Sequence, residues 1–255
     1  MRRLLTRWWY WTLDYAYVGY WQARGLLTWV RRNRHLDPAV PLTWVHRNRH
    51  LDPAGPRRAP VLLIPGIYEA WRFLEPIARR LFEAGHPVHV VPTLGLNHGS
   101  VRAMADLAAA YVREADLRGA VIVAHSKGGL IGKQLMLDEA AADVTEPAGT
   151  TPAPPCIVGM VAINTPFGGS HHATYFPLAA VRALSPAALR SLGEQRAVNA
   201  RITSVFASWD PHIPGGAELA GATNVRVAAM GHFRVIADTP TQDAVLAAVA
   251  QYDAA

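Results

Sequence analysis

Near the middle of the chain the sequence runs Val121-Ile-Val-Ala-His-Ser-Lys-Gly-Gly129. Its apolar, β-branched beginning is typical of a buried strand, and the apolar run Leu130–Leu137 predicts a helix directly after the two glycines. Ser126 therefore stands at a sharp strand-to-helix turn, where neighbours must be small because strand and helix nearly touch. Residues 124–128 follow the G-x-S-x-G pattern of a nucleophile elbow, with alanine in place of the first glycine.

From Pro60 onward, short apolar runs alternate with segments of helical periodicity. Uninterrupted apolar strands separated by amphipathic helices indicate the α/β class, with a mainly parallel sheet covered by helices on both faces. In such a sheet, functional side chains gather at the carboxyl ends of the strands. We predict strands at 61–64, 89–91, 120–124, 157–163, 202–207 and 225–229, and helices at 70–84, 101–112, 130–137 and 244–249.

Length and composition favour one folded domain with a short appendage. The chain has 255 residues, of which 51% are hydrophobic and 17% charged, so a large core is expected and disorder is not. We divide it into an N-terminal appendage, residues 1–59, and a domain, residues 60–255. The single cysteine, Cys156, excludes an internal disulfide and is expected to be a small buried side chain.

The basic charge of the protein belongs to the appendage. Residues 1–59 contain eleven arginines, three acidic residues and six of the eight tryptophans, whereas the rest of the chain is slightly acidic. Arginines combined with tryptophans favour a membrane surface or a protein partner over nucleic acid. The stretch 8–21, which reads WWYWTLDYAYVGYW, is too short and too interrupted by polar residues to span a bilayer.

On a helical wheel, Arg3, Arg7 and Asp14 share one face of this first helix, and most of the aromatic residues cover the remainder. Two interpretations follow. Residues 1–26 form an amphipathic helix in peripheral contact with a membrane, or the helix packs its aromatic side chains on the domain. No small-residue cleavage site follows Arg2, so we do not predict a removable signal peptide. We expect a cytoplasmic protein, which the first interpretation places at a membrane surface.

Three further segments depart from the strand–helix alternation. Residues 27–41 are repeated at 42–56 with thirteen of fifteen positions identical, which we interpret as a duplication that lengthened a linker. Residues 140–155 are rich in alanine and proline and are expected to form an exposed loop. Residues 167–199 are too long for a simple crossover between strands, and we expect them to form a lid above Ser126.

Two residues downstream of Ser126 complete a nucleophilic constellation. A serine hydroxyl is a weak nucleophile at neutral pH, so it needs a base within hydrogen-bond reach and a carboxylate that orients the base. Asp210 and His232 each follow a predicted strand and therefore fall on the same sheet edge as Ser126. The chain order Ser, Asp, His is the order found with this type of elbow.

Other polar residues have simpler interpretations. His212 shares a loop with Asp210 and is a poor candidate base, and His125 is expected to pack beneath the pocket. The pair His171 and His172 lacks acidic or cysteine partners at ligand spacing, so we predict no metal site. No phosphate-binding loop or dinucleotide motif is present, and we predict no cofactor.

These features together resemble an α/β-hydrolase of the lipase/esterase group over residues 60–252. Ile64-Pro-Gly-Ile-Tyr68 is similar to the oxyanion loop, with proline where the family has histidine. Ala162-Ile-Asn-Thr-Pro-Phe-Gly-Gly-Ser170 resembles a pocket-lining segment of triacylglycerol-lipase-like and GPI inositol-deacylase-like enzymes. These enzymes also carry His-Ser-x-Gly-Gly at the elbow.

The resemblance implies hydrolysis of a carboxylic ester through an acyl-enzyme, with Ser126, Asp210 and His232 as the triad. The apolar residues of the segment 167–199 favour a lipophilic ester. The resemblance places the oxyanion hole at the backbone N–H groups of Lys127 and of Ile67 or Tyr68, of which we prefer Ile67. Tyr68 and Phe167 are expected to contact the substrate. Two alternatives stay open: an acyltransferase of the same fold, and a non-catalytic binding module associated with a membrane.

Overall fold

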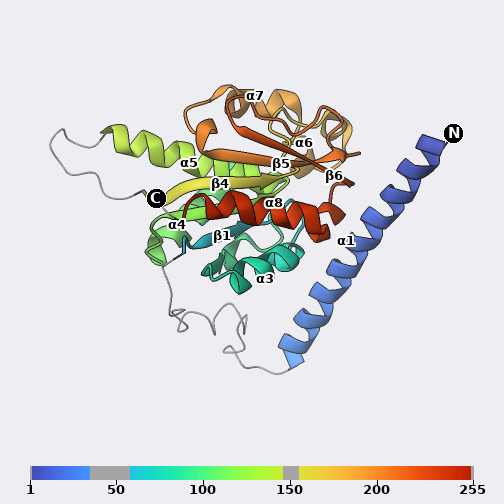
Figure 1. Cartoon of the computed structure of the whole chain (residues 1–255), viewed down its shortest axis with the longest axis horizontal. Coiled ribbons are helices and arrows are strands. Elements are labelled where there is room, and N and C mark those ends of the chain that lie inside the picture. The colour runs from blue at the N-terminus through green and yellow to red at the C-terminus, as the bar shows by residue number, and fades with distance from the viewer. Residues whose placement is uncertain (1, 35–57, 146–154, 254–255) are drawn as a thin grey trace.

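The computed structural model describes residues 2–34, 58–145 and 155–253 (Figure 1). Most of the duplicated segment at 27–56 lies outside these residues, so its interpretation as a linker stays a prediction. The helices are α1 (Arg2–Arg34), α3 (Glu75–Glu83), α4 (Val101–Glu114), α5 (Lys127–Thr145), α6 (Ala179–Arg182), α7 (Pro186–Glu194) and α8 (Thr239–Ala250). Short 3-10 helices are η2 (Trp71–Leu74), η3 (Pro92–Leu94), η4 (His171–Tyr175), η5 (Asn199–Arg201) and η6 (Arg234–Ala237).

Six parallel strands form a single sheet in the order β2-β1-β3-β4-β5-β6. The predicted α/β class and parallel sheet are therefore confirmed, and each predicted strand lies within two residues of its observed bounds. The strands are β1 (Val61–Ile64), β2 (Val88–Val90), β3 (Ala120–His125), β4 (Ile157–Ile163), β5 (Ile202–Trp209) and β6 (Thr223–Met230).

Both faces of the sheet are apolar, which explains why the strands read as uninterrupted apolar runs. Successive side chains of a strand point to opposite faces. In β3, Ile122 and Ala124 pack with α4 and α5, whereas Val121 and Val123 pack with α3 and α8. These strand residues are completely buried. The central strand is thus held between two layers of helices, and its carboxyl end reaches the edge where Ser126 lies.

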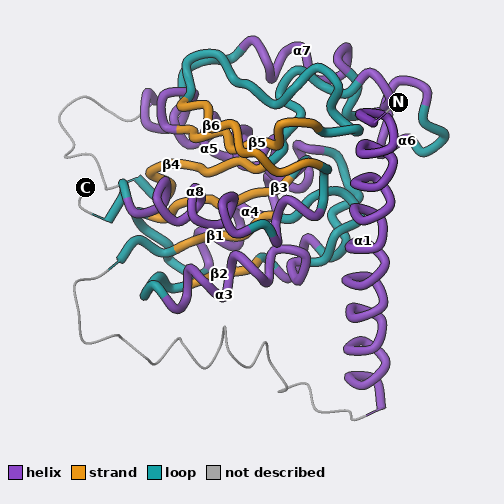
Figure 2. The backbone as a smooth tube through the Cα atoms, turned by 45° about the vertical axis from the view of Figure 1, so that its right-hand side comes forward, coloured by secondary structure: helices purple, strands orange, loops and turns teal. Residues whose placement is uncertain are grey.

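Helix α1 packs along the edge of the domain at the ends of the strands (Figure 2). Asp14 is completely buried and Trp21 nearly so, and the Tyr17 hydroxyl donates to the carbonyl oxygen of Phe73 at 3.1 Å. The Asp14 carboxylate therefore faces the domain, although on the helical wheel it shares a face with Arg3 and Arg7, whose side chains are not among those described. No helix among the described residues is long and apolar enough to cross a membrane.

The segments before and after β4 contain more helix than the sequence analysis predicted. Residues 140–155 were expected to be a loop, but α5 continues to Thr145, and residues 146–154 lie outside the described residues. Residues 167–199 contain η4, α6 and α7. Ser170, His172 and Phe176 of this segment line the same pocket as Ser126. That this segment opens and closes as a lid stays a prediction.

A substitution at Gly128 tests how closely α5 packs against the sheet. A Cβ at this position would lie 2.1 Å from the carbonyl oxygen of Ile64 and 2.7 Å from that of Pro65, and backbone atoms cannot yield as a side chain does. We expect Gly128→Ala to lower the free energy of unfolding by about 3 kcal/mol or more. Urea denaturation followed by circular dichroism measures the change.

Gly19→Ala is the matched control. A Cβ at Gly19 in α1 meets nothing within 4 Å, so alanine is expected to leave the stability unchanged or raise it by up to ~1 kcal/mol. Equal unfolding midpoints for the two variants would contradict the packing described for α5.

Candidate active site

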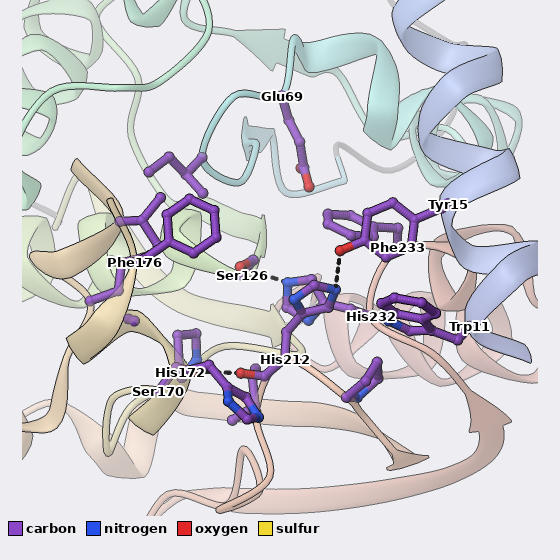
Figure 3. Close-up of a pocket in the computed structure, with 17 residues that line it drawn as sticks. Trp11, Tyr15, Glu69, Ser126, Ser170, His172, Phe176, His212, His232 and Phe233 are labelled. Atoms are coloured by element: carbon purple, nitrogen blue, oxygen red, sulfur yellow. Dashed lines mark hydrogen bonds between the residues drawn. The ribbon is translucent and has the colours of Figure 1, made fainter. Parts of the chain in front are cut away.

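Ser126 occupies the turn between β3 and α5 in a left-handed backbone conformation, with φ of 51°. This conformation is unfavourable for a residue with a side chain, and here its surroundings fix it. The Ser126 N–H donates to the carbonyl oxygen of Ile163 at 2.8 Å, and Gly129 packs so closely on Thr165 that a Cβ would lie 2.1 Å from its Oγ1. The turn points the Ser126 hydroxyl into a pocket at the sheet edge (Figure 3).

The structure brings the three predicted triad residues together. The Nε2 atom of His232 lies 2.9 Å from the Oγ of Ser126, and its Nδ1 lies 2.6 Å from the Oδ2 of Asp210. The other Asp210 oxygen accepts the backbone N–H of His212 at 2.8 Å and that of Ile213 at 3.2 Å. Because both carboxylate oxygens are engaged, Asp210 holds the imidazole of His232 with its Nε2 toward the serine.

The charges in this group shift the pKa values of its members. Burial acts to lower the pKa of His232, but the charge and hydrogen bond of Asp210, helped by the charges of Asp14 and Glu69, raise it above its usual range. Burial likewise acts to raise the pKa of Asp210, and His232 holds it below its usual range. Burial and the neighbouring His232 lower the pKa of His212 to about 4, so this pocket histidine is neutral at physiological pH.

A buried carboxylate of the N-terminal helix fixes the loop that carries His232. The Oδ2 of Asp14 accepts the backbone N–H of His232 at 2.8 Å, and its Oδ1 accepts those of Phe233 at 2.8 Å and Arg234 at 2.7 Å. Bonds from N–H groups to an ionised acceptor are stronger than those between neutral groups. Helix α1 is therefore part of the support of the site.

Asn164 ties the same loop to the sheet from the other side. Its side-chain N–H₂ donates to the carbonyl oxygens of Gly231 at 3.0 Å and His232 at 3.1 Å, and its Oδ1 accepts the N–H of Ala207 at 2.9 Å. Asn164 is completely buried, and its own φ is 44°. The end of β4 thus links the histidine loop to β5, which leads to Asp210.

His125 lies beneath the pocket, as expected, and it pairs with Glu69. Its Nδ1 lies 2.9 Å and 3.0 Å from the two Glu69 oxygens, and its Nε2 lies 2.9 Å from the carbonyl oxygen of His232. A carbonyl oxygen only accepts, so the contact with His232 is made by the N–H of Nε2. Glu69 also accepts the N–H of Gly66 at 2.7 Å, so this pair joins the predicted oxyanion loop to the histidine loop.

The backbone N–H groups of the two preferred oxyanion donors are not used elsewhere in the described part of the protein. Within the described residues, neither the Ile67 N–H nor the Lys127 N–H donates to another group of the protein, and Ile67 lines the pocket. Lys127 is the first residue of α5, where the helix leaves its N–H groups without partners. Its side chain points elsewhere: Nζ donates to the carbonyl oxygens of Asn97 and Gly99, and burial lowers its pKa to about 8.

The structure does not bring Tyr68 and Phe167, the expected substrate contacts, into the lining of the pocket that contains Ser126. Tyr68 has φ of 57°, and its carbonyl oxygen accepts the side-chain N–H of Gln22 in α1 at 2.9 Å. Phe167 is buried in the core, with the Nζ of Lys133 5.9 Å from its ring centroid. Phe167 is thus part of the core, and Tyr68 contacts α1 through its backbone.

The pocket is instead lined largely by residues that the sequence did not indicate. Its volume is about 400 Å³, and α1 closes one side of it with Trp11 and Tyr15 while Phe176 lies opposite (Figure 3). Tyr15 contacts His212, with its hydroxyl 3.4 Å from the Nε2 atom. Further lining residues are Glu69, Pro166, Ser170, His172, Ala173, Val181, Leu184, Pro211, Ile213 and Phe233.

His172 reaches this pocket, but no group of three potential metal ligands is present among the described residues.

Asp14 and Glu69, which support the site and were not identified from the sequence, share one sequence feature. Each is a single acidic residue inside an aromatic or apolar stretch, where burial of a charge requires a dedicated set of partners.

Comparison with solved structures identifies the fold. The lipase BlEst2 of Bacillus licheniformis in its propeptide form aligns with a TM-score of 0.56 and 15% identity over 75% of this chain, and the chain spans about half of that protein, 51%. The metagenomic carboxyl esterase MGS0156 aligns with a TM-score of 0.54 and 15% identity over 79% of this chain and 76% of its own. A CIB-like hydrolase of Thermoplasma acidophilum aligns with a TM-score of 0.52 and 14% identity over 80% and 89% of the two chains.

No protein-family profile and no curated protein sequence matches the chain. At this level of sequence identity, structural similarity establishes the fold alone. The chain has the α/β-hydrolase fold that the sequence resemblance implied. The elbow, the parallel sheet and the Ser–Asp–His order all agree with that assignment.

The charge arrangement predicts how the histidines titrate. We expect His232 to titrate above 6.5 and His212 to titrate near 4, and Asp14→Asn to lower the pKa of His232 because a charge that favours the imidazolium is removed. Two-dimensional NMR of protein with ¹⁵N-labelled histidine measures both values.

Asp106→Asn serves as the control, because Asp106 is an exposed carboxylate of α4 that pairs with Arg102. It should leave both titrations unchanged. An unaltered His232 titration in Asp14→Asn would show that Asp14 does not act on the histidine.

Proposed function

We propose that the protein is a serine carboxylic-ester hydrolase that acts through an acyl-enzyme on lipophilic esters. The observation that carries the proposal is the pair of short contacts that link Ser126 to His232 and His232 to Asp210 at a strained elbow. A serine with a base at 2.9 Å and a carboxylate behind the base is the arrangement that acyl transfer requires. A serine with only a structural role needs neither.

In the proposed reaction, the Oγ of Ser126 attacks the ester carbonyl carbon and gives its proton to the Nε2 of His232. The tetrahedral intermediate collapses, the alcohol leaves with that proton, and the acyl group stays on Ser126. Water then attacks the acyl-enzyme with His232 as its base, which releases the acid and restores the serine. Asp210 stabilises the imidazolium that forms in each half of the reaction.

The oxyanion of both intermediates is proposed to accept the N–H groups of Ile67 and Lys127. Their freedom from other partners supports this assignment. Two such donors fixed before the reaction stabilise the developing charge without reorganisation, by about 3–4 kcal/mol each. The Glu69–His125 pair holds the Gly66 N–H next to Ile67 and thereby positions this loop.

The lining of the pocket favours an uncharged, lipophilic acyl group. Aromatic and aliphatic side chains dominate it, and the neutral state of His212 adds no positive charge beside the triad. The one carboxylate, Glu69, is committed to His125 and Gly66. Burial of an acyl chain in such a site is favourable by ~0.8 kcal/mol per methylene.

Hydrolysis of p-nitrophenyl esters from acetate to palmitate tests the proposal. We expect turnover to rise from acetate through the short acyl chains, by up to about fourfold in kcat/KM for each buried methylene. Ser126→Ala should lower kcat by on the order of 10⁴-fold or more, since the nucleophile is removed.

Ser191→Ala is the matched control, because Ser191 is an exposed serine in α7 outside the pocket. It should retain full activity. Comparable turnover by the Ser126 variant, or no hydrolysis of any ester by the folded wild type, would overturn the proposal. Transfer of the acyl group to an added alcohol in preference to water would favour the acyltransferase alternative.

Asp14→Asn should lower kcat by about ten- to hundredfold, because the amide places an N–H₂ group against the backbone N–H groups that the carboxylate accepted. His232 must be neutral to act as a base, and activity therefore rises with pH through its pKa. Since Asp14 raises that pKa, the acid limb of the kcat/KM–pH profile should move to lower pH in the variant. An acid limb identical to that of Asp106→Asn would rule out this positioning role.

A further inference from the structure

Among the described residues, the exposed large hydrophobic side chains are concentrated on two segments that also contribute to the lining of the pocket. Of the nine that the structure describes, eight lie on α1 or on the segment that precedes α6, and only Leu96 lies on neither. We refer to the eight as the aromatic rim: Trp8, Trp9, Trp11, Tyr15, Tyr20, Tyr175, Phe176 and Leu178.

The rim is continuous with the pocket. Trp8 stacks edge-to-face on Trp11 with ring centroids 5.4 Å apart, Trp11 on Tyr15 at 5.2 Å, and the Tyr15 ring lies 5.8 Å from that of His212. Residues three and four apart share one face of a helix, so these rings form a ladder along α1. Trp11 and Tyr15 line the pocket on one side and Phe176 lines it on the other, so rings at the surface lead directly to the triad (Figure 3).

The packing of α1 keeps the rim at the surface. Another side of the helix is anchored by the buried carboxylate of Asp14 and by Tyr17 and Trp21, which contact the domain. Trp8 and Trp9 stay 63% and 62% exposed, and Tyr175 across the mouth is 90% exposed. An apolar surface of this kind that surrounds a site is typical of an interaction surface.

The charge of α1 indicates which surface the rim contacts. Residues 2–34 contain seven arginines and one acidic residue, Asp14, whose carboxylate is buried and accepts three N–H groups. Arg24 pairs with Glu75, and the other arginines stand at positions 2–7 and 31–34, on either side of the aromatic stretch. Indole and phenol rings favour the headgroup level of a bilayer, and arginines favour anionic lipids.

We propose that the aromatic rim docks on an anionic lipid surface, with the mouth of the pocket opening toward the lipid. The inference deepens the proposed function, since the lipid would supply the lipophilic ester to Ser126. A second copy of the chain fits less well, because two helices with this excess of positive charge repel each other. Rings with a polar edge are also better suited to headgroups than to a dry protein interface.

Sedimentation with vesicles tests the proposal on the full chain. We use the Ser126→Ala protein, so that hydrolysis of lipid does not alter the vesicles. We expect it to bind vesicles of phosphatidylcholine mixed with phosphatidylglycerol more tightly than phosphatidylcholine alone, and added salt to weaken the binding. In this background, Trp8→Ala/Trp9→Ala and Tyr175→Ala/Leu178→Ala should each weaken binding by roughly tenfold.

Leu96→Ala is the matched control, because it removes an exposed large hydrophobic side chain outside the rim. It should bind like the parent protein. Introduced into the wild type, the four rim substitutions should leave hydrolysis of a soluble short-chain ester unchanged, since these side chains do not line the pocket.

Several results would overturn the docking surface. They are absence of binding to every vesicle, equal binding by the rim and Leu96 variants, and a dimer that Trp8→Ala/Trp9→Ala converts to a monomer while vesicles leave the protein in solution. Light scattering reports the last result and would assign the rim to a second copy. Turnover without vesicle binding refutes docking alone, whereas vesicle binding without turnover refutes the hydrolase proposal alone.

Discussion

The left-handed turn at Ser126 is the constraint on which the rest of the site depends. It exists because β3 and α5 approach so closely that Gly128 faces the backbone carbonyl of Ile64, with no room for a side chain. The turn projects the hydroxyl from the carboxyl edge of the sheet and leaves the N–H of Lys127 free at the helix start. A parallel sheet places the ends of β5 and β6 at the same edge, so Asp210 and His232 need only short loops to reach the serine.

The loop of His232 is held by three residues that are far apart in the sequence, so the geometry of the site depends on several elements of the fold. Asn164 contacts it from β4, His125 from beneath the elbow, and Asp14 from α1. Each contact uses a backbone group of the loop, so the imidazole itself stays free for Ser126 and Asp210. The three negative charges nearby, Asp210, Asp14 and Glu69, offset the burial that would otherwise disfavour the imidazolium.

The strands of the sheet and the turn at Ser126 could be predicted from the sequence, because strands buried on both faces and an elbow motif are local patterns. The proximity of Ser126, Asp210 and His232 followed from chain order and from the common edge of a parallel sheet. The role of Asp14 could not be predicted, since it joins positions more than two hundred residues apart, and helical periodicity alone placed this carboxylate with the arginines. Tyr68 and Phe167 failed as pocket residues because a motif fixes the course of the backbone, whereas local φ and core packing decide where the side chain points.

In the proposed reaction Ser126 is a nucleophile that His232 activates. Covalent trapping with a fluorophosphonate tests this activation without knowledge of the substrate. An activated serine attacks the phosphorus atom and fluoride leaves, whereas an ordinary serine does not react. After labelling, intact mass and peptide mass spectrometry should find one adduct per chain, located on Ser126, and no adduct in His232→Ala. An adduct on another serine, or a folded wild-type chain that stays unlabelled, would contradict the account.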